Sequence, residues 1–191
     1  MEDTFINKID TEEKINTIFD NTDKNTNYFT QISDKVVTAY TNDLDALMNK
    51  IREDTIDNTP SDEILEKYVL ELSNLLYFLG TRLETVGIKD DITRMSAKEV
   101  YNNTYTDNLD VAPGGKKPTV AELNVMSENA SRYETVVNSI YSRVYRQIKF
   151  KIDGAYEMLA SLRKIVSKRM QENQLSYTRN SGSVVIGSEE F

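Results

Sequence analysis

The chain has 191 residues, a formal net charge of -8, 39% hydrophobic and 28% charged residues, which suits one soluble domain of ordinary composition. It contains neither Cys nor His, so disulfides, thiolate zinc sites and catalysis by a Ser-His pair are excluded. Three Pro and seven Gly are too few for the many turns of a sandwich or barrel, and the composition therefore predicts an all-α protein.

Residues 1–30 are rich in Asn, Thr and Asp and predict an acidic, partly flexible N-terminal arm. A short helix is expected around Glu12–Phe19, followed by a loop at DNTDKNTN, residues 20–27. The helical domain is expected at 31–175 and a flexible tail at 176–191. An apolar stripe with spacings of three and four residues predicts a helix near 33–54. This stripe consists of Ile32, Val36, Tyr40, Leu44, Leu47 and Ile51.

A second helix is predicted near 61–86, capped by Ser61 and ended by Gly87. A shorter helix is expected at 96–105, because SAKE at 96–99 has the capping-box pattern. Residues 107–118, DNLDVAPGGKKP, contain two Pro and two Gly and predict a linker. The stripe of the second helix has coiled-coil spacing and consists of Leu65, Tyr68, Leu72, Leu75, Leu79, Leu83 and Val86.

The last helix is predicted near 120–172 and begins with a capping box formed by Thr119 and Glu122. At about 1.5 Å per residue it would be roughly 80 Å long, so we expect it to bend near Gly154 or to pack against a partner. Its stripe begins at Met126, Ala130 and Tyr133. The fold expected is an elongated antiparallel helical bundle whose long C-terminal amphipathic helix is used for oligomerisation. The predicted oligomerisation residues are Val137, Ile140, Val144, Ile148, Ile152, Leu159 and Leu162.

Positive charge is concentrated on this last helix. Residues 141–180 contain nine Lys/Arg and three Asp/Glu, whereas residues 1–140 contain 14 and 26. At 100° per residue, most of these cations lie away from the apolar stripe, whereas Lys151 and Arg169 flank it. Phe150 also lies on the polar side, where cations could follow a phosphate backbone and the ring could stack on an unpaired base. The predicted DNA-binding residues are Arg143, Arg146, Lys149, Phe150, Arg163, Lys164 and Lys168.

The alternative interpretation is a solvated helix face. In that case the cations pair with the acidic part of the chain, and Phe150 and its neighbouring tyrosines are buried against another helix or protomer. Acidic pairs such as Asp90 and Asp91 lack EF-hand spacing, so no metal site is predicted. The sequence has no usable catalytic constellation, and we expect no enzyme activity and no cofactor. No stretch approaches the roughly 18 apolar residues of a membrane span, so no membrane partner is expected.

Three segments occur in this order: LSNLLYFLGTRLETVG, KEVYNNTY and VYRQIKFKIDGAYEMLASLRKIVSKRMQE. Together they resemble the UvsY-like recombination mediators of tailed bacteriophages. The resemblance covers about residues 60–175 and rests on pattern and charge. It implies a helical homo-oligomer that binds single-stranded DNA and helps to load a RecA-type recombinase onto strands coated by a single-strand-binding protein. Such a protein would act in the cytoplasm of the infected bacterial host. The alternative is a phage virion structural or assembly protein built from long packed helices, located in the virion.

Overall fold

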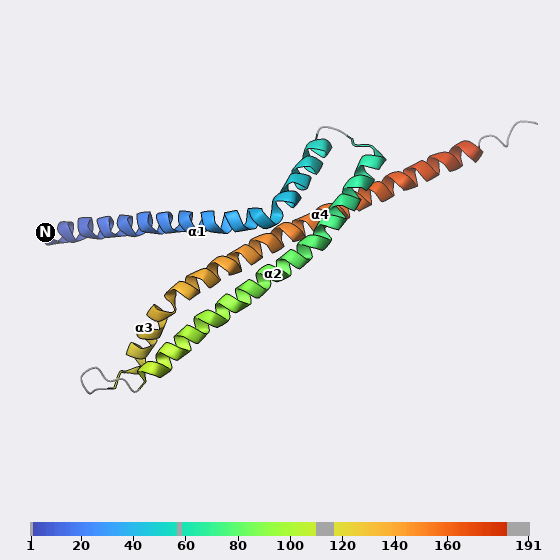
Figure 1. The fold of residues 1–191 in the computed structure, drawn as a ribbon. Helices are drawn as coiled ribbons and strands as arrows, with labels where there is room; N and C mark the ends of the chain where they lie inside the picture. The colour runs from blue at the N-terminus through green and yellow to red at the C-terminus, as the bar shows by residue number, and fades with distance from the viewer. Residues whose placement is uncertain (1, 57–58, 110–116, 183–191) are drawn as a thin grey trace, which may run out of the picture. The chain divides into compact units, whose positions relative to one another are not determined.

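The computed structural model describes residues 2–56, 59–109 and 117–182, with side chains described at 13–56, 59–109 and 117–177. Within these residues the protein is all-α, as the sequence predicts. It forms two compact units. Unit 1 contains Met1–Tyr40 and Glu84–Gln147, and unit 2 contains Thr41–Leu83 and Ile148–Phe191. The described residues of these units form four helices: α1 (Glu2–Ile56), α2 (Asp62–Asn108), α3 (Val120–Ala130) and α4 (Arg132–Gly182) (Figure 1).

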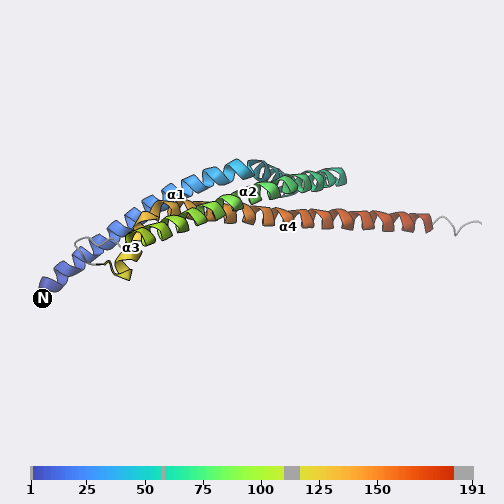
Figure 2. The same ribbon diagram turned by 60° about the horizontal axis from the view of Figure 1, so that its bottom comes forward.

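Unit 2 packs the end of α1, the first half of α2 and the C-terminal part of α4 around an apolar core (Figures 1 and 2). The α1 and α2 segments are antiparallel, since the Tyr68 hydroxyl donates a hydrogen bond to Asp54 across the connection. The α2 and α4 segments are also antiparallel, since Arg169 Nη1 lies 2.9 Å from Asp62 Oδ1. The buried apolar residues of this unit are Leu44, Ile51, Leu65, Tyr68, Leu72, Leu76, Leu79, Ile148, Ile152, Ala155, Leu159 and Leu162.

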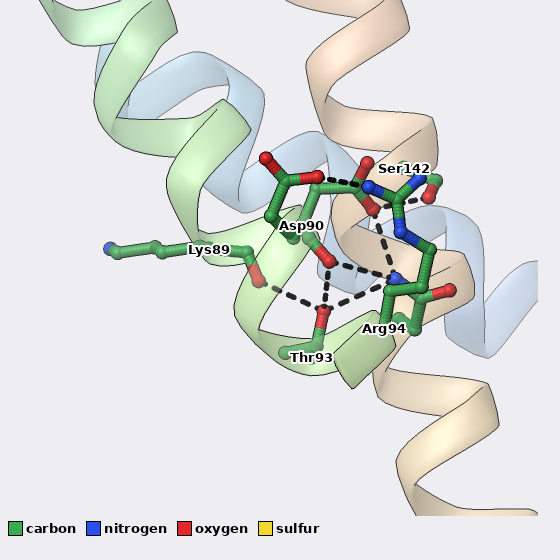
Figure 3. A network of polar contacts seen from close by, with 7 residues as sticks. Lys89, Asp90, Thr93, Arg94 and Ser142 are labelled. Carbon is green, nitrogen blue, oxygen red and sulfur yellow. Dashed lines mark hydrogen bonds and ion pairs between the residues drawn. The ribbon is translucent and has the colours of Figure 1, made fainter. Parts of the chain in front are cut away.

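Unit 1 has a smaller apolar core and a polar network between α2 and α4 (Figure 3). Asn138 Nδ2 donates to the backbone oxygen and to the carboxylate of Asp90, each at 3.0 Å. The Ser142 hydroxyl donates to the same carboxylate, and Asn138 Nδ2 also lies 3.2 Å from Thr93 Oγ1. These hydrogen bonds join the two helix segments at Asp90, whereas Glu134 Oε2 and Gln147 Oε1 of α4 are buried without a hydrogen-bond partner among the described residues. The buried residues of unit 1 are Ser33, Val37, Val86, Leu123, Ser127, Ser131 and Val144.

The loop predicted at 20–27 is wrong, because α1 is helical from Glu2 through these residues. Asn and Thr lower helix propensity by only a few tenths of a kcal/mol per residue, which is a weak signal. The competing signal is the apolar stripe, which continues upstream through Phe19 and Ile15 in the register of the first predicted helix. The predicted N-terminal arm at 1–30 thus lies, over its described residues, within α1.

The predicted stop at Gly87 and the separate helix at 96–105 are also wrong, because α2 is continuous from Asp62 to Asn108. A Cβ built at Gly87 would lie 3.3 Å from the Tyr145 ring. Gly87 therefore allows a close approach of α4 rather than ending α2. The SAKE capping pattern lies inside the helix. The start of α2 is as expected, with the Ile64 amide donating to Ser61 Oγ at 3.4 Å.

The predicted single helix at 120–172 is divided into α3 and α4 at Ser131. The capping box is confirmed: the Glu122 amide donates to Thr119 Oγ1 at 3.3 Å, and the Thr119 amide donates to Glu122 Oε2 at 2.7 Å. The Thr119 amide and hydroxyl both donate to the Glu122 carboxylate, and these two hydrogen bonds lower the pKa of Glu122. Met126 before this break and Tyr133 after it belong to the predicted stripe, but both are exposed. The helix is continuous through Gly154, where a bend was expected.

The predicted linker and tail fall partly outside the described residues. Within the linker, α2 ends at Asn108 and α3 begins at Val120, but residues 110–116 are outside the description. Within the predicted tail, residues 176–182 belong to α4, whereas residues 183–191 lie outside the described part.

Gly154→Ala should raise the free energy of unfolding by about 0.5–1 kcal/mol, because Gly is unfavourable inside a helix and its new Cβ would meet no atom within 4 Å. Gly87→Ala is the matched control. The new Cβ at position 87 would press on the Tyr145 ring, so this variant should show no increase in the free energy of unfolding. Urea denaturation of both variants and the wild type measures the difference, and equal stabilisation at the two sites would contradict the packing role of Gly87.

Tyr68 couples the two antiparallel segments at the end of unit 2. Its side chain is buried, and the hydrogen bond to Asp54, together with burial, raises the pKa of Tyr68 to about 12 from an ordinary value of 10.0. The folded state therefore holds this proton more tightly than the unfolded chain does. The resulting stabilisation is fully present below pH 10 and is lost as the pH rises from about 10 to about 12.

Tyr68→Phe should lower the free energy of unfolding by about 1.5 kcal/mol at neutral pH, because a hydrogen bond to a charged group is removed. The deficit relative to the wild type should shrink above pH 10, where the wild type loses the same contribution. Urea denaturation of both proteins across this pH range tests the prediction. A deficit that stays constant to pH 12 would show that the hydroxyl proton does not carry the effect.

Candidate nucleic-acid interface

The surface of α4 in unit 2 is determined by the residues that the helix buries. Ile148, Ile152 and Leu159 are each at most 5% exposed. Because the helix repeats every 3.6 residues, positions about half a turn away face solvent. Phe150 occupies such a position and is 80% exposed, so its ring is not buried against another element of unit 2. The sequence prediction that Phe150 lies on the polar side of this helix is confirmed.

The predicted cations of unit 2 differ in their surroundings. Lys149 and Lys164 are exposed, and neither forms an ion pair with any residue that the structure describes. Arg163 Nη2 donates to Ser73 Oγ of α2 at 3.2 Å. Lys168 Nζ lies 3.7 Å from Glu172, one helical turn further on, and both side chains are largely exposed. An exposed pair of this kind contributes little stability and leaves the ammonium group accessible.

Arg143 and Arg146 belong to unit 1 and are also exposed. Arg146 Nε donates to the backbone oxygen of Ser142 at 3.3 Å, which leaves the other nitrogen atoms of this guanidinium group directed to solvent or to a ligand. Both arginines precede Phe150 on the same helix, at distances of seven and four residues, and therefore lie on the same side of α4 as Phe150.

Two further cations of α4 stabilise unit 2 instead. Lys151 Nζ is bonded to Asp45 of α1 and lies 3.1 Å from Thr41 Oγ1. Arg169 Nη1 donates to the backbone oxygen of Pro60 at 2.7 Å as well as to Asp62. These are the two cations that the sequence places beside the apolar stripe, where α1 and the start of α2 can reach them. Their charge is matched by carboxylates of the same unit.

Two carboxylates interrupt the cationic side of α4. Asp153 and Glu157 are exposed and lie three and seven residues after Phe150, on the same side of the helix. They separate Lys149 from Lys164 along the helix surface. The positive charge therefore forms two short clusters rather than one continuous ridge. A polyanion that follows α4 would meet cations at both ends of this stretch and repulsion in its middle.

A groove lies between α2 and α4 of unit 2, beside the predicted site. Its volume is about 500 Å³. Tyr77 and Tyr156 contribute exposed rings to it, and Arg163 lies at the same groove. Sequence analysis missed Tyr77, because its position relative to α4 depends on how the two helices pack. The lining consists of Ser73, Leu76, Tyr77, Tyr156, Leu159, Ala160 and Arg163.

The residues predicted to mediate oligomerisation are mostly covered by the chain itself. Ile148, Ile152, Leu159 and Leu162 are buried in the core of unit 2, and Val144 is buried in unit 1. Of the remaining two, Val137 is exposed and Ile140 is partly exposed. The buried members of this stripe therefore need no second protomer to cover them.

No family model, curated protein or solved structure matches this chain. Within the described residues, no three His, Cys, Asp or Glu side chains gather where they could hold a metal ion. No helix in the same residues combines the length and apolar character needed to cross a membrane. Function must therefore be inferred from the surface of α4 and its groove.

Proposed function

We propose that this protein is a non-enzymatic accessory factor that binds single-stranded DNA along the outward side of α4. The observation that carries the proposal is the exposure of the Phe150 ring next to Lys149, whose ammonium group forms no ion pair with the described residues. An exposed ring can stack on an unpaired base while a neighbouring cation neutralises a phosphate. Neither contact reads a base edge, so binding should not depend on sequence.

The groove of unit 2 supports the same proposal. Tyr77 and Tyr156 provide two more aromatic faces, and Arg163 places a guanidinium group at the same groove. Alternation of rings and cations suits a strand whose bases are unstacked and whose phosphates are accessible. Asp153 and Glu157 limit the affinity of one chain, because a strand that passes them is repelled. We therefore expect weak binding per chain, which several chains on one strand would strengthen through avidity.

The cellular part of the proposal rests on the resemblance to the UvsY-like family alone. On that basis, homo-oligomers of this protein assist loading of a RecA-type recombinase onto strands coated by a single-strand-binding protein. They would do so in the cytoplasm of the infected bacterial host. Binding to the recombinase and binding to the single-strand-binding protein would each be measured separately from DNA binding.

The second candidate function is a structural or assembly protein of a phage virion. The observation that favours it is the exposure of large apolar side chains in the first half of α1, including Ile18 and Phe19, which suit packing against protein rather than nucleic acid. Such a protein would co-purify with particles and would not retard single-stranded DNA.

Replacing Lys149 and Lys164 together with Ala should weaken binding to every single-stranded sequence. Each lost phosphate contact removes about 0.7 from the slope of log affinity against log salt concentration, so the slope should fall by about 1.4. Fluorescence anisotropy with labelled oligonucleotides across a salt series measures both quantities. The control with the same change in charge is Lys35→Ala with Lys98→Ala, two exposed lysines on α1 and α2. Unchanged affinity and slope in the folded α4 variant would refute the proposal.

Phe150→Ala should weaken binding by about 1–3 kcal/mol, or roughly 5- to 150-fold, because a stacking face is lost. The salt slope should stay the same, since stacking releases few counterions. Tyr133→Ala is the matched control, because Tyr133 is 81% exposed on α4 but lies outside the proposed surface. If Tyr133→Ala and Phe150→Ala weaken binding equally, the loss reflects general aromatic content and the assignment of Phe150 fails.

A further inference from the structure

Arg163 is held at the groove of unit 2 by a chain of two hydrogen bonds. Its Nη2 donates to Ser73 Oγ at 3.2 Å, and the Ser73 hydroxyl donates to the backbone oxygen of Val69 at 2.6 Å. The Ser73 proton is therefore engaged by Val69, which leaves a lone pair of the same oxygen for Arg163. The guanidinium group belongs to α4 and is exposed, but its position is set by α2.

This guanidinium group keeps most of its hydrogen-bond donors. Arginine has five N–H donors, and the contact with Ser73 uses one of those of Arg163. Among the described residues that line the groove none is acidic, so no carboxylate of the lining competes for the other donors. A planar guanidinium group can bind a phosphate through two parallel hydrogen bonds. Arg163 therefore provides an anion site at a fixed place in the groove.

The rest of the lining suits a nucleobase. Tyr77 is 76% exposed and Tyr156 is 52% exposed, so both rings are accessible to a ligand. Leu76 and Leu159 add apolar lining and are themselves buried. The volume of about 500 Å³ lies in the range of sites for single small molecules, about 300–1,000 Å³. The groove therefore suits one nucleotide rather than a long stretch of strand.

The charges around the groove favour the end of a strand over its interior. An internal nucleotide continues in two directions, and along α4 one of these passes Asp153 and Glu157, which repel phosphates. A terminal nucleotide continues in one direction only, toward Lys164 and Lys168, which are exposed further along α4. A terminal phosphate also carries about 1.5 to 2 negative charges at pH 7, whereas an internal phosphate carries one.

We propose that the groove of unit 2 binds the terminal nucleotide of a single strand that carries a phosphate at that end. The phosphate binds Arg163, and the base stacks on Tyr77 or Tyr156. This assignment rests on the proposed function and names the part of the strand that the groove binds. The ligand is a nucleoside joined to a phosphate monoester, which a 5′-phosphorylated strand and a 3′-phosphorylated strand both supply.

Three oligonucleotides of one sequence test the assignment and distinguish the two ends. One carries a 5′-phosphate, one a 3′-phosphate and one hydroxyl groups at both ends, and each is labelled at an internal base. Fluorescence anisotropy with the full chain should show at least about tenfold tighter binding of one phosphorylated strand, because a charge-assisted contact is added. Equal binding of all three strands overturns the assignment but leaves the proposed function intact. If no strand binds, both fail.

Arg163→Ala should abolish the preference for the phosphorylated end. Arg163→Lys should keep only a small part of it, since an ammonium group cannot form the two parallel hydrogen bonds. The matched control is Lys164→Ala, which removes the same charge from the next residue, outside the groove lining. It should weaken binding of all three strands by a common factor and leave the preference unchanged. If Lys164→Ala abolishes the preference as well, the effect reflects general positive charge and the assignment is overturned.

Competition with small ligands tests the contribution of the rings. Thymidine monophosphate, phosphorylated at the preferred position, should displace the phosphorylated strand at concentrations about 5- to 150-fold lower than inorganic phosphate, because a stacked base is added. Tyr77→Ala should reduce this ratio, whereas Phe78→Ala, which changes an exposed neighbour outside the groove lining, should not. If inorganic phosphate competes as well as the nucleotide, the groove binds an anion alone and the assignment of a nucleotide is overturned.

Discussion

Burial of one side of α4 in unit 2 is the constraint on which the arrangement of the candidate site depends. Ile148, Ile152 and Leu159 each contribute on the order of 1.5–3 kcal/mol when fully buried, so the rotation of the helix about its axis is firmly set. Once that rotation is set, the helical period decides which residues can meet a ligand. Phe150 and Lys164 fall on the solvent side, whereas Lys151 falls where Asp45 can reach it. The chemistry available on the surface follows from the packing beneath it.

The two units are stabilised by different interactions. Unit 2 buries branched aliphatic side chains from three helix segments, whereas unit 1 buries several serines and joins α2 to α4 through Asp90 and Asn138. Lys89 adds a contact with α1, because its ammonium group donates to the Tyr40 hydroxyl at 3.3 Å, and this hydrogen bond raises the pKa of Lys89. A hydrogen-bonded interface needs correct geometry for each partner, whereas an apolar core mainly needs matching volume. Unit 1 should therefore depend more strongly on individual side chains.

The sequence predicts the helices better than their ends. The stripe from Leu65 to Val86 places most of the buried side of α2 correctly, because apolar periodicity reflects burial directly. The helix end predicted at Gly87 is wrong. A glycine inside a helix costs only about 1 kcal/mol, and close packing of Gly87 against Tyr145 outweighs that cost. The break at Ser131 leaves no comparable signal, because apolar residues recur at helical spacing on both sides of it. Helix ends depend on tertiary contacts that local patterns do not contain.

In the candidate site, too, the sequence predicts which side of a helix a residue occupies but not its tertiary contacts. Helical periodicity is enough to predict that Phe150 is exposed and that Lys149 lies away from the apolar stripe. It cannot show that Arg169 is bonded to Asp62 while Lys164 forms no ion pair among the described residues, because these outcomes depend on which helix lies alongside. Tyr77 illustrates the point from the other direction, since only the packing of α2 on α4 brings its ring to the groove that Arg163 lines. The sequence of one helix therefore predicts only the residues that this helix contributes to a surface formed by two helices.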